Sequence, residues 1–143
     1  MRRTRALIGA LLATGSVGSS ACHREPTAPE ATPRIAACDT VGIVSISPGP
    51  TPVIAWSAPC GLGSVSVFRA VDTAAMWSAF NVDNQLVSPI TYGARPSNAS
   101  PGSPATPLVA GQTYRLLLGY NPPAPPGAVI RFVTVVSQQE FVP

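Results

Sequence analysis

Short apolar runs separated by turn residues make up most of the chain after residue 38. These runs are rich in Val, Ile, Phe, Tyr and Thr. None shows a 3.6-residue apolar period free of Gly, Pro and β-branched residues, as an amphipathic helix would. Their spacing of about 8 to 15 residues is typical of an antiparallel β-sandwich. We predict strands at residues 41–47, 52–57, 64–71, 75–80, 86–92, 105–108, 113–120 and 128–136.

The clearest strand pattern lies at residues 114–120. Tyr114, Leu116, Leu118 and Tyr120 fall on one face, while Leu117 makes the other face apolar as well. A strand that is apolar on both faces is covered on both sides, so we expect it in the centre of its sheet. The composition agrees, since 45% hydrophobic residues can form a core and 17 prolines and 12 glycines interrupt helices.

The first 21 residues have the layout of a secretory signal peptide. Residues 1–5 are basic, residues 6–17 are mostly apolar, and residues 19–21 are Ser-Ser-Ala. This is the order of basic region, apolar region and small-residue cleavage site. About a dozen apolar residues are too few for a transmembrane helix, which needs about 20. We therefore expect residues 1–21 to be removed on export.

Cys22 directly follows this small-residue cluster. Ser19-Ser20-Ala21-Cys22 resembles the bacterial lipobox, and the resemblance implies that Cys22 is acylated and holds the protein to a membrane of the bacterial cell envelope, facing the periplasm or the exterior. The lipobox prefers Leu where Ser19 stands, so ordinary cleavage after Ala21, which would give a secreted protein, is the alternative. Residues 22–37 contain three prolines and no apolar period, so we expect an extended tether.

The charge of the chain gives no sign of a nucleic-acid partner. The formal net charge of +3 comes from nine basic and six acidic residues. Arg2, Arg3 and Arg5 lie in the segment that we expect to be removed. Six arginines and six acids remain, so the mature chain is neutral and offers no basic patch to a phosphate backbone.

Three cysteines leave one pair once Cys22 is assigned to lipid. Two strand-like runs flank a Pro-Gly-Pro turn centred on Gly49, and in a hairpin with this centre the numbers of opposite residues sum to 98. Cys38 and Cys60 meet that condition, and cross-strand neighbours lie close enough for a disulfide after small adjustments. We therefore expect a Cys38–Cys60 disulfide, which suits an oxidising compartment. Two buried free thiols are the alternative.

Two motifs within the predicted strands resemble the fibronectin type III family. The segment Leu108-Val-Ala-Gly-Gln-Thr-Tyr114 matches the family's pattern before and into its sixth strand, and Ile54-Ala-Trp56 matches its second strand. The resemblance spans nearly all of the mature chain. It implies an antiparallel immunoglobulin-like sandwich of about seven strands, with Ile54, Trp56, Leu108 and Tyr114 in the core and the Tyr114 hydroxyl bonded to the preceding turn. Because residues 72–107 are longer and richer in Pro and Ser than in the family, a more general immunoglobulin-like sandwich is the alternative.

Side chains suited to catalysis or metal binding are scarce. His23 is the only histidine, and it lies in the tether, where it cannot be held as a base against a serine of the domain. Two cysteines without a histidine in the domain cannot form a four-ligand zinc site. The acids outside the tether fall on separate segments, namely Asp39, Asp72, Asp83 and Glu140. We expect no enzyme activity, no metal and no cofactor.

Recognition would then fall to loops and to exposed aromatic side chains. Trp77, Tyr92 and Tyr120 could form a platform that stacks on a sugar ring or on a partner protein. The Pro-rich loop that begins at Asn121 and the loop at residues 93–107 are further candidates, because loops on rigid scaffolds often carry binding residues.

These observations favour a non-enzymatic, lipid-anchored envelope protein. Its β-sandwich, residues 38–143, would serve as an interaction or spacer module. The expected partners are the membrane, through the lipid on Cys22, and an unidentified protein or glycan. A carbohydrate-binding module that uses exposed aromatics is the alternative.

Overall fold

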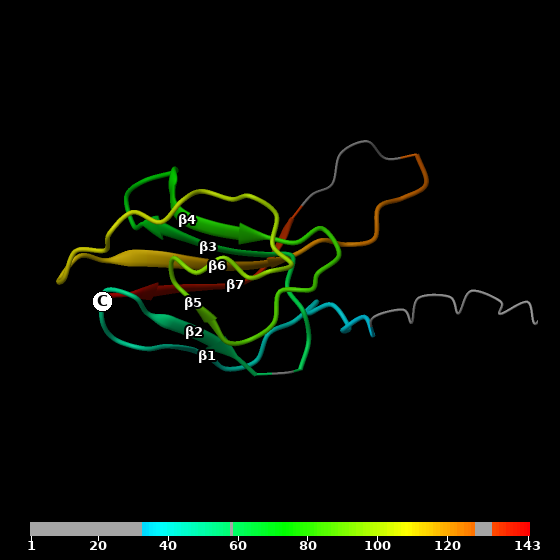
Figure 1. Cartoon of the computed structure of the whole chain (residues 1–143), viewed down its shortest axis with the longest axis horizontal. Coiled ribbons are helices and arrows are strands. Elements are labelled where there is room, and N and C mark those ends of the chain that lie inside the picture. Colours follow the sequence, from blue (N-terminus) through cyan, green and yellow to red (C-terminus); the bar gives the residue numbers. More distant parts are fainter. Residues whose placement is uncertain (1–32, 58, 128–132) are drawn as a thin grey trace, which may run out of the picture. The chain divides into compact units, whose positions relative to one another are not determined.

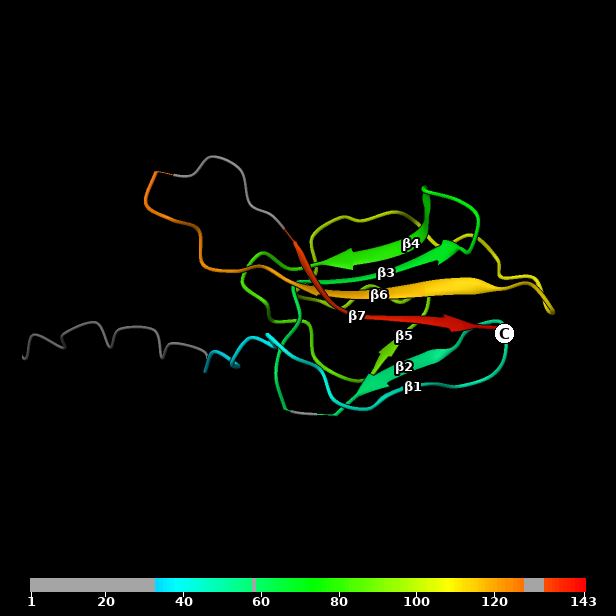
Figure 2. The same ribbon diagram turned by 180° about the vertical axis from the view of Figure 1, so that it is seen from behind.

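Seven strands and no helix are found among the residues that the computed structural model describes, which are 33–57, 59–127 and 133–143. The strands are β1 (Val44–Ile46), β2 (Val53–Trp56), β3 (Ser64–Arg69), β4 (Ala75–Phe80), β5 (Ile90–Thr91), β6 (Tyr114–Tyr120) and β7 (Thr134–Phe141). One sheet has the order β1-β2-β5 and the other the order β4-β3-β6-β7, with every pairing antiparallel. Figures 1 and 2 show the two sheets as layers. The prediction of an all-β sandwich of about seven strands is confirmed.

Inward-facing side chains from both sheets fill the space between the layers. Ile54 and Trp56 of β2 face Val65 and Val67 of β3 and Leu116 of β6 across this core, and each of these side chains is at most 5% exposed. They alternate with outward-facing residues along their strands because successive side chains of a strand point to opposite faces. Burial of a side chain of this size stabilises the fold by about 1.5 to 3 kcal/mol.

The strand β6 lies between β3 and β7, as its sequence predicted. Tyr114, Leu116 and Leu118 are buried on its inner face, and Leu117 is half-buried on the outer face. Leu108, just before this strand, is buried too. All four side chains expected in the core, Ile54, Trp56, Leu108 and Tyr114, therefore lie there.

The strand predicted at residues 105–108 is wrong. Residues 105 and 106 instead end a stretch, residues 100–106, that runs beside the edge of β4. The Ser100 N–H donates to the carbonyl of Phe80 at 2.7 Å, and the Thr106 N–H donates to the carbonyl of Met76 at 3.0 Å. Prolines in the stretch cannot donate to a ladder, so it covers the edge without becoming a regular strand.

Several other strands differ in extent from their predictions. The strand expected at residues 41–47 is reduced to Val44–Ile46, and the one expected at residues 64–71 ends at Arg69. The strand expected at residues 86–92 is reduced to Ile90–Thr91, directly after Pro89, which has no N–H to contribute. The last strand was expected at residues 128–136 and is found at Thr134–Phe141. Its second half, Ser-Gln-Gln-Glu, is polar, and a strand at the edge of a sheet tolerates polar residues more readily than a central strand does. Residues 128–132 of that prediction lie outside the described residues.

Candidate functional sites

A disulfide ties the N-terminal segment to the sandwich. Cys38 and Cys60 are bonded, with their Cα atoms 5.1 Å apart, so the predicted pairing is confirmed. The Cys38 N–H donates to the carbonyl of Gly61, and the Gly61 N–H donates to the carbonyl of Ala36, each at 2.8 Å. These two bonds place Ala37 in a parallel bridge with Gly61. The attachment is thus both covalent and hydrogen-bonded.

The hairpin register that led to this pairing is wrong. Val44 lies opposite Trp56 and Ile46 opposite Ile54, so the numbers of opposite residues sum to 100 rather than 98. The ladder stops at Ile43, whose N–H donates to the Ser57 hydroxyl oxygen at 2.7 Å. Beyond that point the chain turns away and meets Gly61 in a parallel direction. The cysteines therefore approach through this separate bridge and not as cross-strand partners.

Gln85 makes a second attachment to the N-terminal segment, at Ile35, before Cys38 in the sequence. The Ile35 N–H donates to the Gln85 side-chain oxygen at 3.0 Å, and the Gln85 amide donates back to the carbonyl of Ile35 at 3.1 Å. Residues 35–37 were assigned to the tether, but these contacts make them part of the sandwich. We call residues 35–38 with Gln85, Cys60 and Gly61 the N-terminal clamp.

Cys22 and the proposed signal peptide, residues 1–21, lie outside the described residues. Within the described part of the chain, no helix is long and apolar enough to span a bilayer.

Tyr114 makes the hydroxyl contact that the family resemblance implied. Its ring is fully buried, and its hydroxyl oxygen accepts a hydrogen bond from the Val109 N–H at 2.9 Å. The ring also lies 5.8 Å from that of Phe141, centroid to centroid. The contact joins the turn before β6 to the core, which is the role of a tyrosine corner.

The prediction of an exposed aromatic platform is wrong, because two of its three side chains are buried. Trp77 and Tyr92 are only 3% and 4% exposed, and their rings pack on each other with centroids 5.4 Å apart. Trp77 faces inward because it lies opposite Val67 of β3 on the core side of the sheet. Tyr92 follows β5 and closes the core, and its hydroxyl donates to the carbonyl of Thr106 at 2.6 Å. Tyr120 is half-buried, so no stacking platform is formed by this set.

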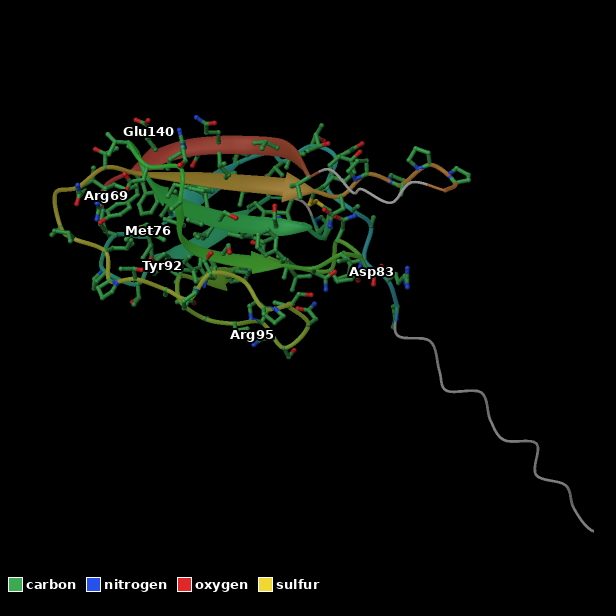
Figure 3. All side chains as sticks on the ribbon, turned by 90° about the horizontal axis from the view of Figure 1, so that it is seen from above. Arg69, Met76, Asp83, Tyr92, Arg95 and Glu140 are labelled. Atoms are coloured by element: carbon green, nitrogen blue, oxygen red, sulfur yellow. A yellow bond between two sulfur atoms is a disulfide. The ribbon has the colours of Figure 1, made fainter. Side chains whose placement is uncertain are left out.

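Burial also changes the acidity of Tyr92. Desolvation raises the pKa of its hydroxyl. The label in Figure 3 marks its place, on the side of the sandwich where the segment around Arg95 also lies. A neutral, hydrogen-bonded tyrosine of this kind is a structural group.

Asn121, a predicted binding residue, is held by contacts inside the protein. Its N–H donates to the Asn84 side-chain oxygen at 2.7 Å, and the Asn84 amide donates back to the carbonyl of Asn121 at 2.8 Å. The Asn121 amide also donates to the carbonyl of Asn81 at 3.0 Å. A Cβ added at Gly63 would come within 2.4 Å of the Asn121 amide nitrogen, so this position admits only glycine without a shift. The network fastens the loop after β4 to the loop after β6, and the sequence pattern gave no signal for it.

The loop at residues 93–107 encloses a groove with β4. The groove has a volume of about 210 Å³, and Trp77, Arg95 and Gly102 are among its lining residues. Arg95 donates to the carbonyl of Ala99 within its own loop at 3.4 Å. Because residues 100–106 are bound to the β4 edge, this loop is fixed on the sandwich rather than free to close on a ligand.

The charged side chains do not gather into a reactive group. Figure 3 shows Asp83 and Glu140 at opposite ends of the sandwich. Arg69 and Asp72 form an ion pair at 3.5 Å, which is partly exposed and contributes little to stability. Among the described residues, no three His, Cys, Asp or Glu side chains lie close enough together to hold a metal ion.

Comparisons with models of protein families, with curated proteins and with solved structures found no match to this chain.

Proposed function

We propose that this protein is a lipid-anchored component of the bacterial cell envelope. In this proposal Cys22 carries the lipid, the Pro-rich segment after it spans the distance to the domain, and a fibronectin type III-like sandwich serves as an interaction or spacer module. The basic, apolar and small-residue order of residues 1–21 supports export, and the lipobox-like Ser19-Ser20-Ala21-Cys22 supports acylation.

The observation that carries the proposal is the N-terminal clamp. A force applied to the tether would be transmitted from Cys38 through the disulfide to Cys60. Cys60 lies four residues before Ser64, where β3 begins. β1 and β2 lie between the two cysteines in the sequence, so they stand outside this covalent path. The reciprocal Ile35–Gln85 bonds add a second attachment at the same place. This arrangement suits a domain that is held to a surface by its N-terminus.

The strand arrangement supports the fibronectin type III-like assignment. The family has three strands in one sheet and four in the other, and the orders β1-β2-β5 and β4-β3-β6-β7 agree with that division. The hydroxyl of Tyr114 bonded to the turn before β6 is the second supporting feature. Such sandwiches host many functions, so the assignment supports a scaffold and leaves the partner to be identified by its own chemistry.

Membrane fractionation of cells that produce the full chain tests the anchor. We expect the wild-type protein in the membrane fraction, resistant to high salt and released by detergent, because acyl chains bind through buried CH₂ groups at about 0.8 kcal/mol each. The Cys22→Ala variant should move to the soluble fraction. Thr27→Ala, a change in the tether that keeps Cys22, is the matched control and should stay with the membrane. Retention of the Cys22→Ala variant in the membrane would refute the proposal.

A further inference from the structure

The groove between β4 and the loop at residues 93–107 has the size of a site for one small ligand. Its volume is about 210 Å³, which exceeds the roughly 150 Å³ of a cavity that takes up benzene. Trp77 and Ala79 of β4, residues 93–95 and residues 100–105 line it. A single sugar ring or a small organic acid therefore fits within it.

The walls of this groove are held together by the protein's own hydrogen bonds. The Ser78 N–H donates to the carbonyl of Ser103 at 3.2 Å, and the Ser103 N–H donates back to the Ser78 hydroxyl oxygen at 2.8 Å. On the other segment, the Ala94 N–H donates to the carbonyl of Thr91 at 3.0 Å. A Cβ added at Gly102 would overlap the carbonyl oxygen of Ser78, so this close approach requires glycine. A site that is already formed loses little conformational entropy when a ligand binds.

Trp77 brings an unused hydrogen-bond donor to the groove. Its side chain is 3% exposed, and its indole N–H has no acceptor among the described residues. The side-chain nitrogens and oxygens of the described chain that are both enclosed and unpartnered are the Nε atoms of Arg69 and Arg115, so the Trp77 nitrogen reaches accessible space. The indole N–H of Trp56, in contrast, donates to the carbonyl of Cys60. An indole N–H can only donate, so Trp77 lacks an acceptor.

Arg95 adds a positive charge to the same groove. No Asp or Glu is among the lining residues, and the ion pair of the described chain joins Arg69 to Asp72, so Arg95 has no carboxylate partner there. Its guanidinium donates to the carbonyl of Ala99 at 3.4 Å, which leaves most of its five N–H groups available. Figure 3 shows Arg95 on the loop that runs along this side of the sandwich.

We propose that this groove binds a small carboxylate. The carboxylate oxygens accept hydrogen bonds from the Arg95 guanidinium and the Trp77 indole N–H, while Pro101 and Pro104 cover the body of the ligand. Charge-assisted bonds of this kind are roughly twice as strong as neutral ones, and the guanidinium fork matches a carboxylate. One arginine balances the single charge of a carboxylate, whereas a phosphate group carries about 1.5 to 2 charges. A free acid and an acidic sugar share this chemistry.

The indole N–H signals of the ¹⁵N-labelled full chain test the site, because the chain has two tryptophans. The signal that disappears in Trp77→Phe, or that remains in Trp56→Phe, belongs to Trp77. In mild non-ionic detergent, we expect glucuronate to shift the Trp77 signal and leave the Trp56 signal in place. The dissociation constant should be on the order of 1 mM, as for a ligand of about a dozen non-hydrogen atoms. Glucose, the matched neutral sugar, should shift neither signal.

Acetate distinguishes the two sources of the carboxylate. A shift of the Trp77 signal with acetate would show that the carboxylate alone is sufficient, and a shift with glucuronate only would assign the site to acidic sugars. Arg95→Gln should weaken glucuronate binding about tenfold, because it removes a charge-assisted donor. Arg34→Gln makes the same change at an exposed position outside the groove, so it is the matched control and should bind like the wild type.

A Trp77 signal that stays in place up to about 100 mM of either acid would overturn the proposal. So would equal shifts with glucose and glucuronate, or equal affinities of Arg95→Gln and Arg34→Gln for glucuronate. None of these results would affect the proposed membrane anchor, because fractionation of Cys22→Ala does not depend on this groove.

Discussion

Replacement of both bridge cysteines by alanine would measure how much the N-terminal clamp stabilises the sandwich. The disulfide closes a loop with a sequence separation of 22. On the loop-entropy model, opening a loop of this length costs roughly 3 kcal/mol. Cys38 is 1% exposed, so its truncation also removes core contacts, at a cost on the order of 1 kcal/mol. We expect the Cys38→Ala/Cys60→Ala variant to lose about 3 to 4 kcal/mol of unfolding free energy, a large share of the roughly 5 to 15 kcal/mol that domains possess.

Urea unfolding followed by tryptophan fluorescence provides the assay. Trp56 is buried, and its indole N–H donates to the carbonyl of Cys60 at 3.4 Å, so its share of the emission reports on the clamp region. Trp77, which is also buried, reports on the core between the sheets. The midpoint should fall, and the slope should rise, because the unfolded chain without the bridge is less compact and exposes more surface. Cys22→Ser, which leaves the bridge intact, is the control and should unfold like the wild type. A loss below about 1 kcal/mol in the double variant would contradict the reasoning.

The remaining predictions concern the two buried tyrosine hydroxyls. Tyr114→Phe leaves the Val109 N–H without its acceptor and should lower the unfolding free energy in urea by about 1 to 2 kcal/mol. Tyr120→Phe, at a half-buried ring, is the control and should lower it by under about 0.5 kcal/mol. Equal losses in the two variants would argue against a tyrosine corner. Burial raises the pKa of Tyr92, so the folded protein holds this proton to higher pH than the unfolded chain. The resulting stability is fully present below about pH 10 and is lost as the pH rises through the folded pKa. The fall in unfolding free energy at alkaline pH should therefore be shallower in Tyr92→Phe, and a variant with the same alkaline slope as the wild type would show that Tyr92 is not responsible.

Local patterns in the sequence were enough to predict the fold class and the core. The alternation of Tyr114, Leu116 and Leu118 predicts an inward face, and Leu117 predicts cover on the outer face, because period-2 burial is a property of a single strand. The resemblance of Ile54-Ala-Trp56 to the second strand of the fibronectin type III family implies the opposite side of the core. Each of these inferences needs only neighbours in the sequence, and each was confirmed.

Features that depend on distant segments were not predictable in this way. The cysteine pairing came out correctly although its register was off by two residues, since the bridge forms through Gly61 beyond the end of the hairpin. The sequence leaves Trp77, Tyr92 and Tyr120 as candidates for exposure, because which face a short strand buries depends on the sheet opposite. The contacts of Asn121 with Asn84 join residues 37 positions apart, and no single-sequence pattern marks such a pair.

The most direct test of the account is the mass of the N-terminal peptide of the mature protein. Lipid anchoring requires that the chain begin at Cys22 and that this residue carry acyl groups. We therefore expect mass spectrometry of the membrane-extracted protein to find a peptide starting at Cys22 with the added mass of its lipid. A peptide that starts at Cys22 with a bare thiol, or one that still includes residues 1–21, would contradict the account.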